Sequence, residues 1–194
     1  MIGIYGGTFD PLHNGHIHVI KQLLLSRAVE RIILVPAGEP LLRQRPVASG
    51  KDRLAMCELA VASVKGIQGS VTVSAIEVEK DGPSYAIDTA ESLMKENPGK
   101  EFAWIIGSDA YRKIDQWHES ERLQKMVSFI VIERPEADRD DDSELDEIDP
   151  LDIDALDISA TEIRSRIAKR ESISHLLPAA VLGYIESKGI YASL

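Results

Sequence analysis

The sequence has little of what marks a secreted or membrane protein. Its 194 residues include one cysteine, Cys57, so no disulfide can form within the chain, and the helical pattern around this thiol predicts that it is buried. No apolar run approaches the roughly 20 residues of a membrane helix, and no basic and apolar leader opens the chain. These absences favour a cytoplasmic protein with no membrane partner.

The chain also has fewer basic than acidic residues. The chain has 22 Lys and Arg against 32 Asp and Glu, which gives a net charge of −10. The excess lies at 138–157, and the rest of the chain is balanced. A nucleic-acid partner is not expected, since it needs a basic surface, whereas a single nucleotide needs only a few local cations. We expect one domain over residues 1–194, with a flexible acidic insertion at 136–157.

Strand and helix patterns alternate along the chain. Short apolar runs predict strands at 2–5, 31–36, 70–79, 101–107 and 127–133, and a further short strand within 151–158. Helical spacing predicts helices at 15–28, 51–64, 84–96, 159–170 and 178–189, with one or two short helices around Trp117. The alternation predicts an α/β fold: a Rossmann-like, doubly wound, mostly parallel sheet with helices on both faces and a small helical C-terminal part.

Ligands of such sheets bind at the carboxyl ends of the strands, so the loops that follow the strands are the candidate site. The first, GGTFDPLHNGH, is neither a P-loop nor a G-x-G-x-x-G motif. Gly6 and Gly7 still allow a ligand to approach the backbone. Gly15 opens a helix whose free N–H groups can bind phosphate, and His13 and His16 lie beside that helix start as donors.

Two other interpretations of the histidines are open. The run HNGHIH supplies three imidazoles for a metal, but no further ligand follows at a zinc-motif spacing. The histidines could instead cap the helix or lie at the surface, and we assign His18 to that role. We predict phosphate binding for His13 and His16 and no resident metal site.

A second anion site is predicted at ISATEIR. Ser159 and Glu162 have the spacing of a capping box, which marks a helix start, and Arg164 lies in the first turn. Arg166 and Arg170 are predicted to be solvated or paired with Glu. This helix start should face the first loop across the same sheet edge.

The stretch IIGSDAYRKIDQW carries a third group of candidates. Gly107 follows a buried strand, and Asp109 can accept hydrogen bonds from ribose hydroxyls or an amine. Trp117 can stack on an aromatic ring, and packing in the core is the alternative for it.

These motifs together resemble a known family. GGTFDPLHNGH resembles the G-x-[ST]-F-x-P-x-H-x-G-H signature of the nucleotidylyltransferase superfamily, and ISATEIR, about 145 residues later, resembles its C-terminal motif. VPAG, GPSYAIDT, FAWIIGSDA, Trp117 and LLPAAVLGYIESKGIY are similar to bacterial nicotinate mononucleotide adenylyltransferases. Phosphopantetheine adenylyltransferase shares the outer motifs but lacks the GPSY and GSDA blocks, and is the alternative within the superfamily.

The resemblance implies transfer of AMP from ATP to nicotinate mononucleotide, which forms deamido-NAD and pyrophosphate in NAD biosynthesis. It implies Mg²⁺ with ATP and no covalent intermediate. His13, His16 and Arg164 would then be catalytic through charge stabilisation. The implied ATP contacts are Gly6, Gly7, Thr8, Phe9, Gly15, Gly107, Asp109, Ser159, Thr161 and Ile163. The implied mononucleotide contacts are Ser84, Tyr85, Trp117 and a cation from Arg43 or Arg45.

The chain departs from the family pattern on the mononucleotide side. Ala86 stands where a threonine is usual, and Leu41 and Leu42 stand in a loop that often reads P-P-H-K. Nicotinamide mononucleotide is therefore an alternative acceptor, because a neutral amide needs one fewer cationic contact than a carboxylate. An inactive nucleotide-binding regulator is an alternative of another class, which the intact His13, His16 and Arg164 disfavour. The sequence leaves a homo-oligomer open.

Overall fold

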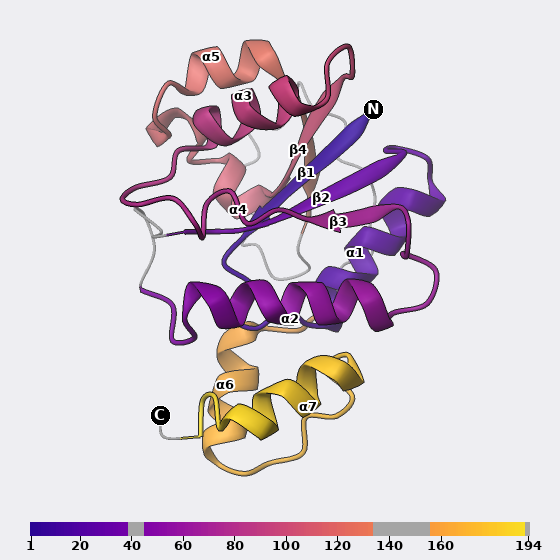
Figure 1. Cartoon of the computed structure of the whole chain (residues 1–194), viewed down its shortest axis with the longest axis vertical. Helices are drawn as coiled ribbons and strands as arrows, with labels where there is room; N and C mark the ends of the chain where they lie inside the picture. Colours follow the sequence, from indigo (N-terminus) through magenta and orange to yellow (C-terminus); the bar gives the residue numbers. More distant parts are fainter. Residues whose placement is uncertain (39–44, 134–155, 193–194) are drawn as a thin grey trace.

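A five-stranded parallel sheet forms the centre of the computed structural model, which describes residues 1–38, 45–133 and 156–192 (Figure 1). Its strands are β1 (Ile2–Gly7), β2 (Arg31–Pro36), β3 (Val71–Val73), β4 (Phe102–Gly107) and β5 (Ser128–Ile132). They lie in the order β3-β2-β1-β4-β5, and every pairing is parallel. The chain runs outward from β1 in one direction and then returns to continue in the other, so the predicted doubly wound fold is confirmed.

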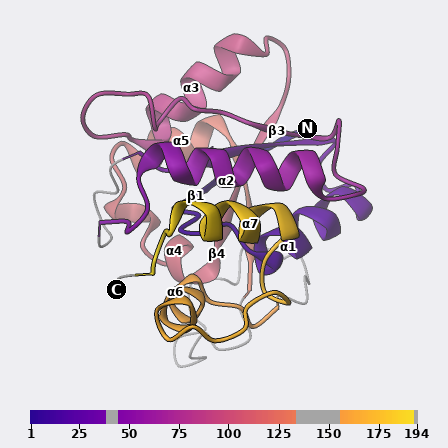
Figure 2. The same cartoon turned by 60° about the horizontal axis from the view of Figure 1, so that its bottom comes forward.

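Helices cover both faces of the sheet. They are α1 (Asn14–Leu25), α2 (Gly50–Ser63), α3 (Ala86–Glu96), α4 (Ser108–Tyr111), the 3₁₀ turn η1 (Ile114–Gln116), α5 (Ser120–Met126), α6 (Ala160–Ala168) and α7 (Ala179–Lys188). In Figure 1, α3 and α5 lie on one side of the sheet and α1 and α2 on the other. Figure 2 shows α7 lying along α2, which makes α6 and α7 the small helical part that the sequence predicts.

Two apolar cores, one for each face, hold these layers together. Along β2, Ile32 and Leu34 join the core under α1 and α2, whereas Ile33 and Val35 join the core under α3 and α5. Alternate residues of one strand thus point to opposite faces, and both faces are buried. This double burial explains why the strand reads as an uninterrupted apolar run.

Some boundaries differ from the prediction. The strand expected at 70–79 ends at Val73, because β3 pairs only with residues 32–34 of β2 and the chain then turns. The residues with the alternating pattern beyond Val73 form that turn. There the Glu77 carboxylate accepts hydrogen bonds from Gly38 and Thr89. In the predicted strand at 151–158, residues 151–155 lie outside the described part, and residues 156–158 are irregular.

Candidate active site

The loop after β1 turns tightly before it enters α1. Phe9 has a left-handed backbone, with φ of 48°, and its ring folds back over Gly7. A Cβ at Gly7 would lie 2.9 Å from that ring, and one at Gly6 would lie 3.2 Å from Trp104. The structure therefore adds a packing reason for these glycines, because Phe9 and Trp104 approach the positions of their Cβ atoms closely. Room for a ligand at Gly6 and Gly7 stays a prediction.

The two histidines meet at the first turn of α1. His13 is the residue before the helix, and its backbone N–H donates to Nδ1 of His16 at 3.2 Å. The rings stack with their centroids 3.7 Å apart, and His16 also meets the edge of Phe9. Because Nδ1 of His16 accepts a hydrogen bond, the neutral ring carries its proton on Nε2. His16 is therefore a helix cap, as one alternative proposed, and it is also oriented as an Nε2–H donor.

The start of α6 lies directly beside the start of α1. A Cβ at Gly15 would lie 3.5 Å from the Cβ of Ile158, just before α6. Nη1 of Arg164 donates to the carbonyl oxygen of Asp10 at 2.8 Å, and Nη2 donates to Oγ1 of Thr161 at 3.2 Å. The prediction that this helix start faces the first loop is confirmed. A guanidinium, two imidazoles and two helix N-termini thus gather at one sheet edge, which gives it the chemistry of an anion site.

The capping box that marks α6 is only half formed. Oγ of Ser159 accepts a hydrogen bond from the backbone N–H of Glu162 at 3.4 Å. The Glu162 carboxylate turns instead to Arg166, with Nη2 at 2.6 Å, so the predicted pairing of Arg166 with a glutamate is confirmed. Among the described residues, the Ser159 side chain caps the helix start.

Ile163 does not face the site. Its side chain is fully buried in the core on the α1 side of the sheet, and its backbone N–H is bonded to the carbonyl oxygen of Ser159. The side chain of Ile163 therefore anchors α6, which positions Arg164 one residue later, and a contact between the Ile163 backbone and ATP stays a prediction.

Arg53, for which the motifs predict no role, lies between two loops of the site. Its side chain is 2% exposed and donates to the carbonyl oxygens of Thr8 at 2.8 Å and Gly38 at 3.2 Å. Burial lowers the pKa of this guanidinium from its usual value. The signal was present in the sequence: Arg53 has helical spacing with Met56, Cys57 and Ala60, so a charge lies on the buried face of α2.

Glu77 holds the loop after β2 from the other side. Its carboxylate accepts from the Gly38 N–H at 3.3 Å and from the Thr89 hydroxyl at 2.8 Å, and burial raises its pKa. A Cβ at Gly38 would overlap the carbonyl oxygen of Glu77 and lie 3.0 Å from Oγ of Ser84. Ser84, predicted on the mononucleotide side, therefore lies beside the loop after β2.

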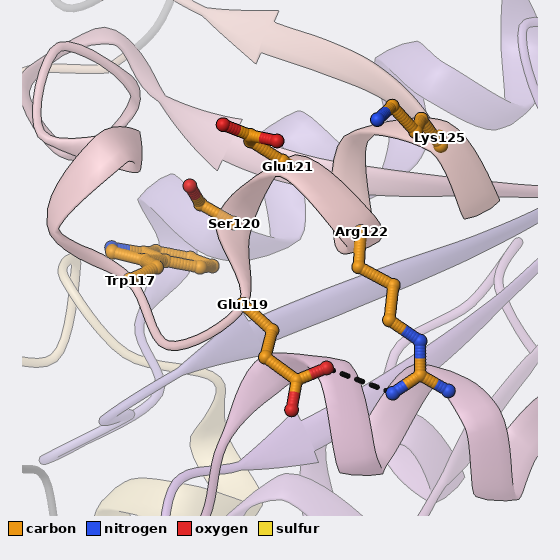
Figure 3. A pocket seen from close by; sticks show the side chains of 6 residues that line it. All are labelled: Trp117, Glu119, Ser120, Glu121, Arg122 and Lys125. Atoms are coloured by element: carbon orange, nitrogen blue, oxygen red, sulfur yellow. Dashed lines mark hydrogen bonds and ion pairs between the residues drawn. The ribbon is translucent and has the colours of Figure 1, made fainter.

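The other predicted residues of the mononucleotide side lie around the start of α5. Trp117 meets Trp104 edge to face at 6.0 Å between centroids, and Tyr85 packs against His118 at 4.3 Å. Trp117 also lines an open hollow of about 510 Å³, whose other lining residues are Glu119, Ser120, Glu121, Arg122 and Lys125 (Figure 3). This hollow includes none of the histidine or Arg164 side chains. Trp117 thus combines partial core packing with an exposed face.

Gly107 and Asp109 lie at the end of β4, where the sequence predicts ribose contacts. Gly107 is the residue before α4, Ser108 is buried, and Asp109 is exposed to solvent. Their position at a carboxyl end of the sheet beside β1 agrees with the site that the fold predicts.

Some predictions lie outside the described residues, namely Arg43, the Leu41–Leu42 pair and most of the acidic insertion. Within the described part, no group of three or more His, Cys, Asp or Glu is arranged to hold a metal ion. None of the helices there has the length and apolar character to cross a membrane.

The chain was compared with known protein families to find those that share its sequence. Residues 4–166 match the cytidylyltransferase-like family. The chain belongs to this family. Two relatives named "Probable nicotinate-nucleotide adenylyltransferase" are those of Methylacidiphilum infernorum (isolate V4), 38% identical, and Synechococcus sp. (strain JA-3-3Ab), 37% identical. These alignments cover 98% of this chain and 91% and 94% of the relatives, so the resemblance inferred from the motifs is confirmed over almost the whole chain.

Solved structures of nicotinic acid mononucleotide adenylyltransferase have the same fold as this chain. Plasmodium falciparum nicotinic acid mononucleotide adenylyltransferase complexed with NaAD superposes with a TM-score of 0.81 at 23% identity, covering 98% of this chain and 96% of that one. The same enzyme complexed with APC gives a TM-score of 0.78 with the same coverage. The Rossmann-like architecture of this chain is therefore shared with these solved structures.

Proposed function

We propose that this chain is a nicotinate-nucleotide adenylyltransferase that acts in NAD biosynthesis. A phosphate oxygen of nicotinate mononucleotide attacks the α-phosphorus of ATP and forms a new P–O bond. The bond between the α-phosphorus and the oxygen that bridges to the β-phosphorus breaks, and pyrophosphate leaves with that electron pair. The products are deamido-NAD and pyrophosphate.

The observation that carries the proposal is the hydrogen bond from Arg164 to the carbonyl oxygen of Asp10. It joins the two motifs of the sequence and brings the starts of α1 and α6 together. One helix start binds a single phosphate, whereas two adjacent starts with a guanidinium suit the triphosphate of ATP. The names of the relatives support nicotinate mononucleotide as the acceptor.

Catalysis in this proposal is positioning and charge stabilisation. Negative charge builds up on the pyrophosphate as it leaves, and donors that are fixed in advance stabilise it at no reorganisation cost. In the proposal, Nε2–H of His16 and the guanidinium of Arg164 are such donors. The backbone N–H of His13 fixes the His16 ring, and the carbonyl oxygen of Asp10 fixes Arg164. This explains why a nucleophilic side chain is unnecessary.

Mg²⁺ enters, in the proposal, as part of the MgATP substrate. This ion prefers octahedral oxygen ligands and keeps several waters, so phosphate oxygens with few protein carboxylates suffice for it. The Asp10 carboxylate, whose Oδ2 lies 3.8 Å from Nη1 of Arg164, already accepts backbone hydrogen bonds. This donor set fits a metal carried by the nucleotide.

On the acceptor side, we propose that Tyr85 and Trp117 hold the pyridine ring and that Ser84 contributes a hydroxyl. The Ser84 Oγ is buried and has no hydrogen-bond partner among the described residues, so it is available to a ligand. Ala86 begins α3 and supplies no hydroxyl, so a contact that a threonine would make at this position must come, in the proposal, from the backbone of this helix start.

The test measures pyrophosphate release from ATP with nicotinate mononucleotide, nicotinamide mononucleotide or phosphopantetheine as acceptor. The proposal predicts the highest kcat/KM with nicotinate mononucleotide. A preference for the amide would identify nicotinamide mononucleotide as the acceptor, and turnover with phosphopantetheine alone would move the chain to the other branch of the superfamily. No turnover with any of them would contradict an enzymatic role.

A further inference from the structure

Asp10 is the meeting point of four segments that are far apart in the sequence. Its carboxylate accepts from the backbone N–H groups of Val47 at 2.8 Å and Ala48 at 3.0 Å, just before α2. Its carbonyl oxygen accepts from Arg164 of α6. The fourth segment is the turn after α7, where the Tyr191 hydroxyl donates to Oδ1 of Asp10 at 2.7 Å.

The backbone of Tyr191 has an energetically unfavourable conformation. Its φ of 67° lies in the left-handed region, which is unfavourable for an aromatic residue. The side chain is 4% exposed and packs in the core on the α1 side of the sheet. Burial and the bond to Asp10 raise the pKa of Tyr191, so its hydroxyl keeps its proton and remains a donor.

We propose that Tyr191 is a positioning residue for AMP transfer: through Asp10, it fixes the loop 8–10 and the guanidinium of Arg164. This inference rests on the proposed function. The Asp10 side chain is held by three donors, and the same residue presents its carbonyl oxygen to Arg164. If the Tyr191 hydroxyl is lost, the carboxylate keeps only the Val47 and Ala48 N–H groups, and Asp10 is held less firmly. Arg164 then loses the fixed orientation that charge stabilisation requires.

The chain offers a matched control for this effect. The Tyr184 hydroxyl, on α7, donates to Oδ1 of Asp52 at 2.9 Å. Tyr184→Phe and Tyr191→Phe therefore remove the same atom from the same kind of bond, but Asp52 has no contact with Arg164 or the first loop among the described hydrogen bonds. Only the Tyr191 substitution should affect the chemistry.

The experiment is a double-mutant cycle that measures kcat and both KM values at a temperature where every variant is folded. In the wild-type background, we expect Tyr191→Phe to lower kcat about tenfold, since a hydrogen bond to a charged group is lost. The KM for nicotinate mononucleotide should stay unchanged. In an Arg164→Ala background, the same substitution should lower kcat less than about twofold, because the group that it positions is absent.

The outcomes separate this inference from the proposed function. Absence of turnover in the wild-type protein would contradict the function itself. A wild-type enzyme that turns over while Tyr191→Phe matches Tyr184→Phe in kcat would overturn the positioning role. Equal losses of kcat with and without Arg164 would also overturn it, since Tyr191 would then act by another route. A fall in Tm with normal kcat would show that Tyr191 only stabilises the fold.

Discussion

At the scale of single residues, the site depends on side chains that fix one another before any substrate arrives. His16 is held by the His13 backbone, Arg164 by Asp10 and Thr161, and Arg53 by two loop carbonyls. Each of these bonds fixes the orientation of a donor or acceptor group within the site. Such mutual support lowers the entropy cost of ordering donors around a charged transition state.

His16→Ala tests the catalytic role of the imidazole. We expect kcat to fall about 10²-fold or more, because a fixed donor to the departing pyrophosphate is lost. Steady-state kinetics measures the effect, and circular dichroism checks that α1 is retained. Turnover near the wild-type value would show that His16 is only a helix cap.

Glu77→Gln tests the buried carboxyl beside the loop after β2. Burial raises the pKa of Glu77, so the folded protein favours the protonated acid, which glutamine imitates. Below the usual carboxyl pKa, the stability difference between the two proteins should be constant. As the pH rises through the raised pKa, the wild type should lose stability relative to Glu77→Gln.

Thermal unfolding at a series of pH values measures this difference. A wild type that gains stability over Glu77→Gln as the pH rises would show that hydrogen bonds to the carboxylate outweigh its burial.

At the scale of elements, most of the scaffold is predictable from the chain. The apolar runs of β1, β2 and β4 and the spacing in α2 and α6 are local signals, and the structure confirms them to within a few residues. The prediction for β3 was too long, because the residues of the following turn alternate between apolar and polar as a strand would. A local pattern cannot distinguish these, since the length of an edge strand is set by its neighbour.

The supports of the site were less predictable for the same reason. Asp10 was visible inside the first motif, but its partners at Val47, Arg164 and Tyr191 come from three other segments. Arg53 was detectable as a charge on an apolar helix face. Ile163 was given a ligand role by resemblance, although its spacing in the helix already indicated a core residue.

Gly38→Ala tests the tight packing between the loop after β2 and the segment at Glu77. A Cβ at Gly38 would overlap a backbone oxygen, which cannot move aside as a flexible side chain can. The loop must shift, and we expect kcat/KM for nicotinate mononucleotide to fall about 10²-fold.

Gly183→Ala is the control, because a Cβ there meets nothing within 4 Å and the position lies within α7. It should be neutral or stabilise the fold by up to about 1 kcal/mol. Equal kinetics for the two alanine variants would show that the loop tolerates displacement.

At the scale of the whole molecule, the sheet edge joins parts of the chain that fold into different layers. α1 follows the central strand, whereas α6 belongs to the small helical part beyond α2 (Figure 2). A ligand that binds both helix starts should therefore stabilise the folded chain as a unit.

ATP with Mg²⁺ should raise the Tm of the wild type. At a concentration of about 100 times Kd, linkage gives about 2.7 kcal/mol. For a chain of this size, that corresponds to a rise of roughly 5–10 °C. Differential scanning calorimetry measures the shift, which should be much smaller for Arg164→Ala at the same ATP concentration. An equal shift in both proteins would place the triphosphate away from α6.

The central claim is that this chain transfers the adenylyl group of ATP to a pyridine mononucleotide. The most direct measurement supplies ATP labelled at the α-phosphorus together with nicotinate mononucleotide and follows the label by chromatography. Attack at the α-phosphorus predicts label in deamido-NAD and unlabelled pyrophosphate in equal amount, with both formed about 10²-fold more slowly by His16→Ala. Labelled ADP with free orthophosphate, or unchanged ATP, would contradict the account.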